Sequence, residues 1–173
     1  MPDNATARPA GAGDMFLSVK GAKGGVIKGE ALDDAHKGEI EVLSWSWGMH
    51  ARPSLGGGGA TGKAAVHELK IVKRIDSAST ALMSALRTNE LIVKAVLTLR
   101  KAGKGQLEYL KITIEQGRVT SLTLEAGDTS GSAELSEHLS FSFNKITVEY
   151  VPQGKDGQAL GSTMYADQWD ETS

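Results

Sequence analysis

Apolar and polar residues alternate with a period of two along most of this 173-residue chain, and Gly-rich stretches interrupt the alternation. A period of two is typical of β-strands that bury one face. The pattern predicts strands over residues 15–20, 26–27, 39–52, 64–75, 91–100, 106–116, 119–126, 137–151 and 158–167. Residues 101–105 and 116–118 are expected to form hairpin turns. The chain is therefore expected to be mainly β.

One segment has the spacing of a helix. Leu82, Met83 and Leu86 recur at helical intervals. Asp76 or Ser77 is expected to cap this helix, because either side chain can accept a hydrogen bond from a free backbone N–H of the first turn. The helix is expected to end near residues 88–89.

Two of the predicted strands change phase. In 137–151 the apolar positions are first odd and then even: Leu139, Phe141, Phe143, Ile146, Val148 and Tyr150. In 39–52 they are first even and then odd: Ile40, Val42, Leu43, Trp45 and Trp47. Such a slip requires a bulge or a bend, since a regular strand would expose half of these residues. Long bent strands shared between sheets close barrels. The pattern predicts a closed barrel of two packed, mostly antiparallel sheets with one flanking α-helix.

The segment 43–49 combines two tryptophans with two serines. Trp45 and Trp47 are two residues apart, so they share one strand face, and Ser44 and Ser46 share the other. A buried Trp removes about 200 Å² from water, worth about 5 kcal/mol by area. We therefore expect Trp45 and Trp47 to be core anchors and the two serines to lie on a small, polar outer face.

Composition narrows the possible functions. The net charge is −2 without a basic run, which argues against nucleic acid as a partner, and the absence of cysteine excludes disulfides and Cys-based zinc sites. No apolar stretch approaches the roughly 18 residues of a membrane span, so no membrane insertion is expected. Residues 1–13 are interpreted as a flexible N-terminal arm without the apolar core of a secretory signal, and residues 14–173 as a single domain.

A Gly-rich segment matches part of a phosphate-binding motif. Residues 57–63 fit G-x-x-x-x-G-K, but the next position is Ala64 instead of Ser or Thr, and a strand follows where the motif requires a helix. We therefore interpret the segment as an extended loop. Loops of this length are usually functional or disordered.

No catalytic residue, metal site or cofactor is expected elsewhere. Asp33, Asp34 and His36 are grouped, but they are interpreted as a solvated polar turn. The basic residues Arg100, Lys101 and Lys104 are likewise interpreted as a solvated hairpin tip. The chain contains no G-x-S-x-G motif, so an enzyme is not expected.

An ordered set of sequence blocks resembles the hemolysin-coregulated protein (Hcp) family of the bacterial type VI secretion system. The blocks are DMFL at 14–17, KGE at 28–30, His36, Glu39-Ile40, VLSWSWGM at 42–49, Gly62-Lys63, IDSAS at 75–79, LTLRKAG at 97–103, EYL at 108–110, Glu149-Tyr150 and Pro152-Gln153. The resemblance covers about residues 14–165, so the domain is expected to be an Hcp-like β-barrel.

The resemblance implies a homohexameric ring whose copies stack into a tube. A contractile sheath would push the tube out of the cell, a spike protein would form the tip of the tube, and effector proteins would be carried in its lumen. Assembly would be cytoplasmic, followed by secretion without a signal peptide. It also implies a ring-stacking loop composed of Leu55, Gly56, Gly57, Gly58, Gly59, Ala60, Thr61, Gly62 and Lys63.

Two questions remain open from the sequence. The resemblance implies that the side carrying Ser44 and Ser46 lines the lumen and contacts effectors, with Ser46 the stronger candidate. The competing interpretations are an ordinary solvated strand face or a subunit interface. For the whole protein, the alternatives to a tube component are a stand-alone secreted β-sandwich binding module and an enzyme.

Overall fold

The computed structural model describes residues 14–51, 64–102, 106–128 and 133–169. The expected N-terminal arm 1–13 lies outside this range. The elements are β1 Asp14–Gly21, β2 Gly25–Ile27, β3 Ile40–Ser46, β4 Met49–His50, β5 Ala65–Val66, β6 Leu69–Arg74, α1 Ser79–Arg87, β7 Ile92–Arg100, β8 Glu108–Asp128, β9 Ala133–Ser142, β10 Lys145–Tyr150 and β11 Thr163–Gln168. In the described residues, the predicted predominance of strands and the predicted helix are confirmed.

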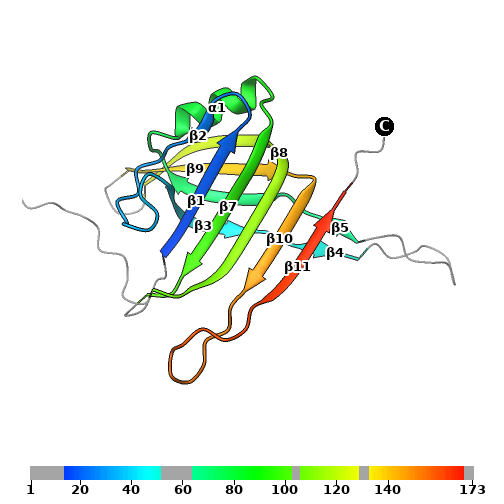
Figure 1. Cartoon of the computed structure of the whole chain (residues 1–173). Coiled ribbons are helices and arrows are strands. Elements are labelled where there is room, and N and C mark those ends of the chain that lie inside the picture. The colour runs from blue at the N-terminus through cyan, green and yellow to red at the C-terminus, as the bar shows by residue number, and fades with distance from the viewer. Residues whose placement is uncertain (1–13, 52–63, 103–105, 129–132, 170–173) are drawn as a thin grey trace, which may run out of the picture.

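Six strands close a barrel. Their order is β8-β7-β1-β3-β6-β9, and β9 pairs back onto β8. All of these pairings are antiparallel. β10 and β11 continue the sheet outward from β8, beyond the barrel wall, and α1 lies across one end of the barrel (Figure 1). The predicted closed barrel with a flanking helix is confirmed.

β8 corrects the prediction of a hairpin turn at residues 116–118. The chain does not reverse there, because residues 108–128 form one continuous strand. The part up to Gly117 pairs with β7 and β10, and the part from Arg118 onward pairs with β9. Gln116 has a positive φ of 54°, and a Cβ on Gly117 would lie 2.2 Å from the carbonyl oxygen of Ser142. Glycine therefore permits a bend that carries one strand from the first sheet into the second.

The two predicted phase changes have different structural causes. In 39–52 the register shifts between Val42 and Ser44, which is the predicted bulge, and the strand then ends at Ser46 before β4 begins. In 137–151 the chain forms two strands instead of one bent strand. β9 and β10 are separated at residues 143–144, where the N–H of Asn144 donates to the carbonyl oxygen of Glu115 at 3.2 Å. This break turns the chain from one sheet to the other.

The helix closes one end of the hydrophobic core. Ala78, Leu82 and Ala85 are buried in the cluster that fills the barrel. The predicted cap is wrong, because the N-cap residue is Ala78. The Asp76 carboxylate instead accepts the N–H of the N-cap residue Ala78 itself, at 3.0 Å.

A fully buried ion pair joins this helix to the barrel wall. Lys73 and Glu137 face each other across β6 and β9, with Nζ and Oε2 2.6 Å apart and both side chains without solvent exposure. Lys73 also donates to Asp76, and the Ser79 hydroxyl donates to Glu137 at 2.6 Å. The first turn of α1 is thereby tied to β6 and β9 by hydrogen bonds to Lys73 Nζ and Glu137 Oε2, while Oε1 of Glu137 is buried without a hydrogen-bond partner among the described residues.

Candidate functional site

The outward side of the wall formed by β3, β6, β9 and β8 carries short hydroxyl side chains. Ser46 lies opposite Lys70, which lies opposite Ser140, which lies opposite Ser121. The adjacent row runs from Ser44 through Val72 and His138 to Thr123. We refer to the five hydroxyl residues as the hydroxyl face: Ser44, Ser46, Ser121, Thr123 and Ser140. All of them except Ser140 are exposed.

Sequence reasoning identified only two members of the hydroxyl face. The other three members, Ser121, Thr123 and Ser140, alternate with apolar residues, and this alternation was the signal that could have identified them as outward-facing. No local pattern indicates that their strands lie beside β3.

The wall carries few charges between these hydroxyls. His138 approaches the carboxylate of Glu125 at 3.4 Å, and Lys70 is exposed. The surface can therefore offer many weak hydrogen bonds without a strong field of one sign.

Trp45 and Trp47 point away from Ser44 and Ser46. Both indoles are partly buried and pack against the core cluster. Trp45 lies opposite Ile71, which faces Leu139. Within the described residues, the Nε1 atom of Trp47 is buried and has no hydrogen-bond partner. The alternation of Trp and Ser along β3 thus separates an inner apolar face from an outer polar one.

β4 and β5 extend the β3–β6 pair into a projecting hairpin. Met49 pairs with Val66 and His50 pairs with Ala65, in a two-stranded sheet separate from the barrel (Figure 1). The expected ring-stacking residues Leu55 to Lys63 connect these two strands and lie outside the described residues. Their role stays a prediction.

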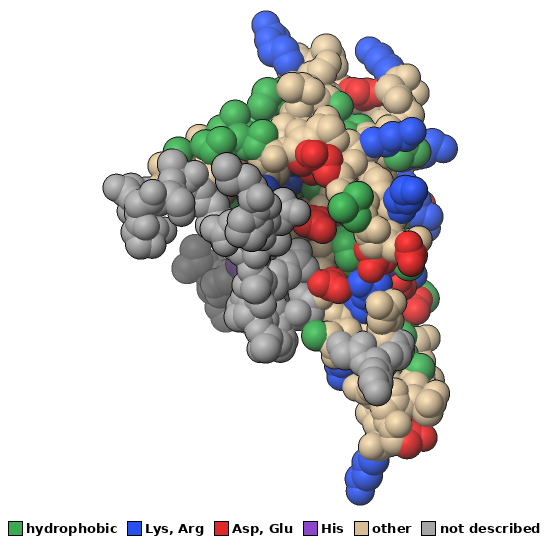
Figure 2. Space-filling model, turned by 90° about the vertical axis from the view of Figure 1, so that its left-hand side faces the viewer, with side chains coloured by type: hydrophobic (Ala, Val, Ile, Leu, Met, Phe, Trp, Pro, Cys, Tyr) green, Lys and Arg blue, Asp and Glu red, His purple; other side chains and the backbone are tan. Residues whose placement is uncertain are grey.

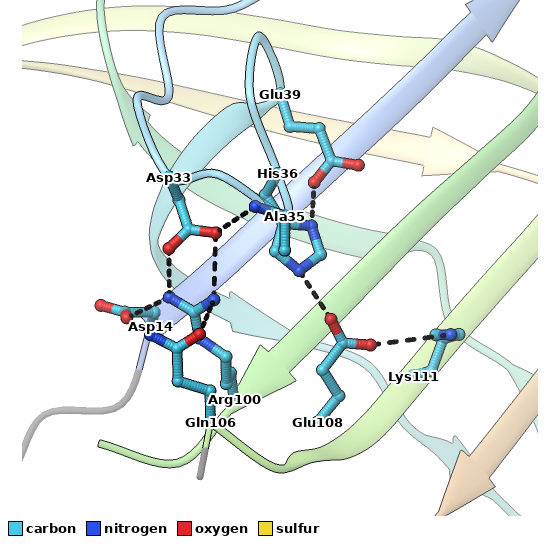
Figure 3. Close-up of polar contacts among 9 residues, drawn as sticks. All are labelled: Asp14, Asp33, Ala35, His36, Glu39, Arg100, Gln106, Glu108 and Lys111. Carbon is cyan, nitrogen blue, oxygen red and sulfur yellow. Dashed lines mark hydrogen bonds and ion pairs between the residues drawn. The ribbon is translucent and has the colours of Figure 1, made fainter. Parts of the chain in front are cut away.

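The segment 28–39 folds over the outer face of β1 and β7. The Arg100 guanidinium binds Asp33 through two hydrogen bonds, at 3.0 and 2.6 Å, and binds Asp14 at 2.8 Å (Figure 3). Next to it, His36 contacts Glu39 and Glu108 through its two ring nitrogens and stacks on Phe16 with ring centroids 4.4 Å apart. We call the Asp14, Asp33 and Arg100 group the arginine clamp.

The arginine clamp overturns two sequence interpretations. Arg100 is only 3% exposed, so it is not part of a solvated hairpin tip, and His36 is buried instead of lying in a solvated turn. The hydrogen bonds from Arg100 lower the pKa of Asp33 from 3.8 to about 2, and the two carboxylates raise the pKa of Arg100. These side chains hold the 28–39 segment in place. In the described part of the chain, no group of three or more His, Cys, Asp or Glu side chains is arranged to hold a metal ion.

The outer face of the other sheet carries basic side chains in cross-strand register. Lys20 lies opposite Lys94, Lys94 opposite Glu115, and Glu115 opposite Lys145. Figure 2, in which this face runs along the right-hand margin, shows Lys and Arg side chains there together with Asp and Glu side chains. This surface therefore differs in charge from the hydroxyl face on the opposite side of the barrel.

The strands that overhang the barrel expose apolar side chains. Val148 lies opposite Tyr165, in the same cross-strand row as the buried Ile112. Tyr165 is 41% exposed and Tyr150 is 45% exposed. At the end of β10 and β11 opposite to Tyr150, Phe143 and Trp169 form a tilted aromatic pair that lines an open pocket of about 310 Å³ together with residues 64–68. The overhanging strands β10 and β11 thus present a partly exposed apolar surface.

Comparisons with known proteins agree with this architecture. A model of the family described as "Type VI secretion system effector, Hcp" matches residues 16–150. Protein hcp1 of Pseudomonas aeruginosa is 40% identical over 154 residues, which cover 87% of this chain and 91% of that protein. The crystal structure of Hcp1 from Salmonella typhimurium superposes with a TM-score of 0.73 at 34% identity, covering 91% of this chain and 95% of that one.

A second solved structure, described as that of a type six secretion system protein, has a TM-score of 0.77 at 30% identity and covers 88% of this chain and 92% of its own. The barrel, the overhanging strands β10 and β11, and the similarity to these proteins together define a small β-barrel protein of the bacterial type VI secretion system. More narrowly, the chain belongs to the Hcp family of the type VI secretion system. In the part that the structure describes, no helix is long and apolar enough to cross a membrane.

Proposed function

We propose that this chain is the structural subunit of a type VI secretion tube. Six copies form a ring, the rings stack into the inner tube, and effector proteins are held in the lumen. Family membership supports the proposal. A ring requires a heterologous interface, in which one surface of a subunit meets a different surface of its neighbour. The apolar overhang and the charged outer face of the other sheet supply distinct surfaces of this kind.

The observation that carries the proposal is the hydroxyl face. Its side chains are short, so a ring that turns this face inward keeps a wide channel open. The exposed hydroxyls donate and accept hydrogen bonds without the desolvation cost of buried charges. Such a wall can contact different folded cargoes weakly, and we assign Ser46, with Ser44 beside it, to the lumen contact.

The projecting hairpin supports a role for residues 55–63 in stacking. β4 and β5 hold the two ends of this segment together, away from the barrel. A Gly-rich segment mounted on a hairpin can adapt to the surface of an adjacent ring and become ordered when it binds.

The partners of the proposed tube follow from this role. They are copies of the same chain, a spike protein at the tip, a contractile sheath around the tube and effector proteins inside it. The subunit would assemble in the cytoplasm and leave the cell through the type VI machine. The proposal requires no catalytic residue, cofactor or nucleic acid.

Sedimentation velocity of the purified chain, combined with negative-stain imaging, tests the proposal. The expected result is a particle of six times the 18.2 kDa chain mass that images as a ring with a central hole. A species of one or two copies at all concentrations, without a hole, would contradict it. That result would favour the alternative of a stand-alone binding module.

A further inference from the structure

The projecting hairpin carries two histidines whose rings meet. His50 is on β4, and His67 directly follows β5. The N–H of His67 donates to the carbonyl oxygen of Gly48 at 2.9 Å, so the two strands stay paired at this position. With His50 opposite Ala65, the two histidines occupy diagonal positions on the same face of the ladder, within reach of each other.

The ring nitrogens that meet are Nδ1 of His50 and Nε2 of His67, 2.7 Å apart. The ring centroids are 5.0 Å apart and the planes are inclined by 72°. A neutral imidazole has one N–H and one nitrogen with a free lone pair. The neutral pair therefore shares a single proton between two nitrogens that converge on the same point.

We propose that His50 and His67 form a binding site for a divalent transition-metal ion that prefers tetragonal geometry, such as Cu²⁺ or Ni²⁺. The ring that donates the shared proton exchanges it through solvent for a proton on its other nitrogen, so both imidazoles stay neutral and the ion is held by the lone pairs of His50 Nδ1 and His67 Nε2. Imidazole nitrogen suits these ions, and tetragonal sites built from nitrogen and oxygen ligands are typical of Cu²⁺ and Ni²⁺.

The spacing of the nitrogens favours this geometry. With metal–nitrogen bonds of about 2.0–2.1 Å, two ligands at adjacent tetragonal positions lie about 2.9 Å apart, whereas two tetrahedral ligands lie about 3.3 Å apart. The present 2.7 Å separation is that of a hydrogen bond, and the two nitrogens need to part by only about 0.2 Å to reach the first value. The rings must tilt so that both lone pairs face the ion, and the strands that carry them need not move.

Both histidines are exposed, so water can supply the remaining ligands. The bound ion would link β4 to β5 at the base of the segment 52–63 and so restrain the hairpin. This site is independent of the proposed tube function, since it depends only on the β4–β5 pairing.

Calorimetric titration of the full chain with CuCl₂ or NiCl₂ tests the site, with His50→Gln and His67→Gln as the variants. Glutamine can retain a hydrogen bond, so the surface hairpin is expected to stay folded. His138→Gln is the matched control, because His138 is also exposed but lies on the barrel wall.

One ion should bind per wild-type chain and per His138→Gln chain. Loss of an outer-shell partner alone costs roughly 10–100-fold in metal affinity, so loss of either ligand should cost at least as much. Electron paramagnetic resonance of the Cu²⁺ form should show two coordinated nitrogens. Absence of saturable binding, or equal affinity in the wild type and both hairpin variants, would overturn the proposal.

Discussion

The Nη2 atom of Arg100 lies 2.6 Å from Oδ2 of Asp33, although 67 positions separate the two residues in the sequence. This contact fixes the 28–39 segment against β7, and it makes the stability of the barrel sensitive to acid. The pKa of Asp33 in the folded protein is about 2, below its ordinary value of 3.8. The ionised carboxylate therefore stabilises the fold above 3.8, and this contribution is lost as the pH falls toward 2.

Asp33→Asn should lower the melting temperature at neutral pH, because Arg100 loses its bidentate partner. The difference from the wild type should shrink as the pH falls from 3.8 to 2, since the wild-type carboxylate becomes protonated in that window. Thermal unfolding followed by circular dichroism at several pH values measures this. Asp34→Asn, at the exposed neighbouring position, is the control and should follow the wild-type curve. Parallel curves for wild type and Asp33→Asn would contradict the assignment.

The buried Lys73–Glu137 pair should show strong coupling between its members. Lys73→Met alone leaves the Glu137 carboxylate buried without its cation and should cost about 3–5 kcal/mol of the free energy of unfolding. Lys73→Met combined with Glu137→Leu removes both charges and should recover most of that loss. Urea denaturation of the two single variants and the double variant measures the coupling. Additive losses would show that the pair is not coupled.

The bend in β8 should depend on the absence of a side chain at Gly117. In Gly117→Ala the new Cβ would meet the Ser142 carbonyl at 2.2 Å, so the backbone must shift, at a cost of roughly 1–3 kcal/mol or more. Gly127→Ala is a matched control in the same strand, since no atom lies within 4 Å of its new Cβ. The control should be neutral or slightly stabilising. Chemical denaturation compares them, and equal stability would refute the steric explanation.

The lumen assignment of Ser46 predicts a defect that affects cargo but not rings. Ser46→Glu adds bulk to the hydroxyl face, and the new carboxylate lies opposite Lys70, so the fold should tolerate it. Rings should keep their sedimentation coefficient, and less effector should co-purify with them. Ser84→Glu, on the exposed surface of α1, is the control. Dissociated rings would instead place Ser46 at a subunit interface, and unchanged cargo would remove it from the lumen contact.

The features of the fold that could be predicted from the sequence were those set by the alternation of apolar and polar residues within a single strand. The separation of Trp45 from Ser46 and the bulge after Val42 depend on a period of two, which each strand shows by itself. The bend at Gly117 was mistaken for a turn, because a glycine between polar residues marks a change of direction without indicating its angle. The pairing of Arg100 with Asp33 depends on tertiary contact between distant segments, and no local signal identifies it.

Because β8 belongs to both sheets, it should couple the local unfolding of one sheet to that of the other. If β9 separates from β8, β8 loses its hydrogen-bond partners in one half but keeps β7 and β10 in the other half. The two sheets are thus joined through the continuous backbone of β8. Amide protons in both halves of β8 should therefore exchange with deuterium as a single cooperative block. The barrel should therefore resist separation of its strands from either side, because neither sheet has an unpaired strand edge where the two sheets meet at β8.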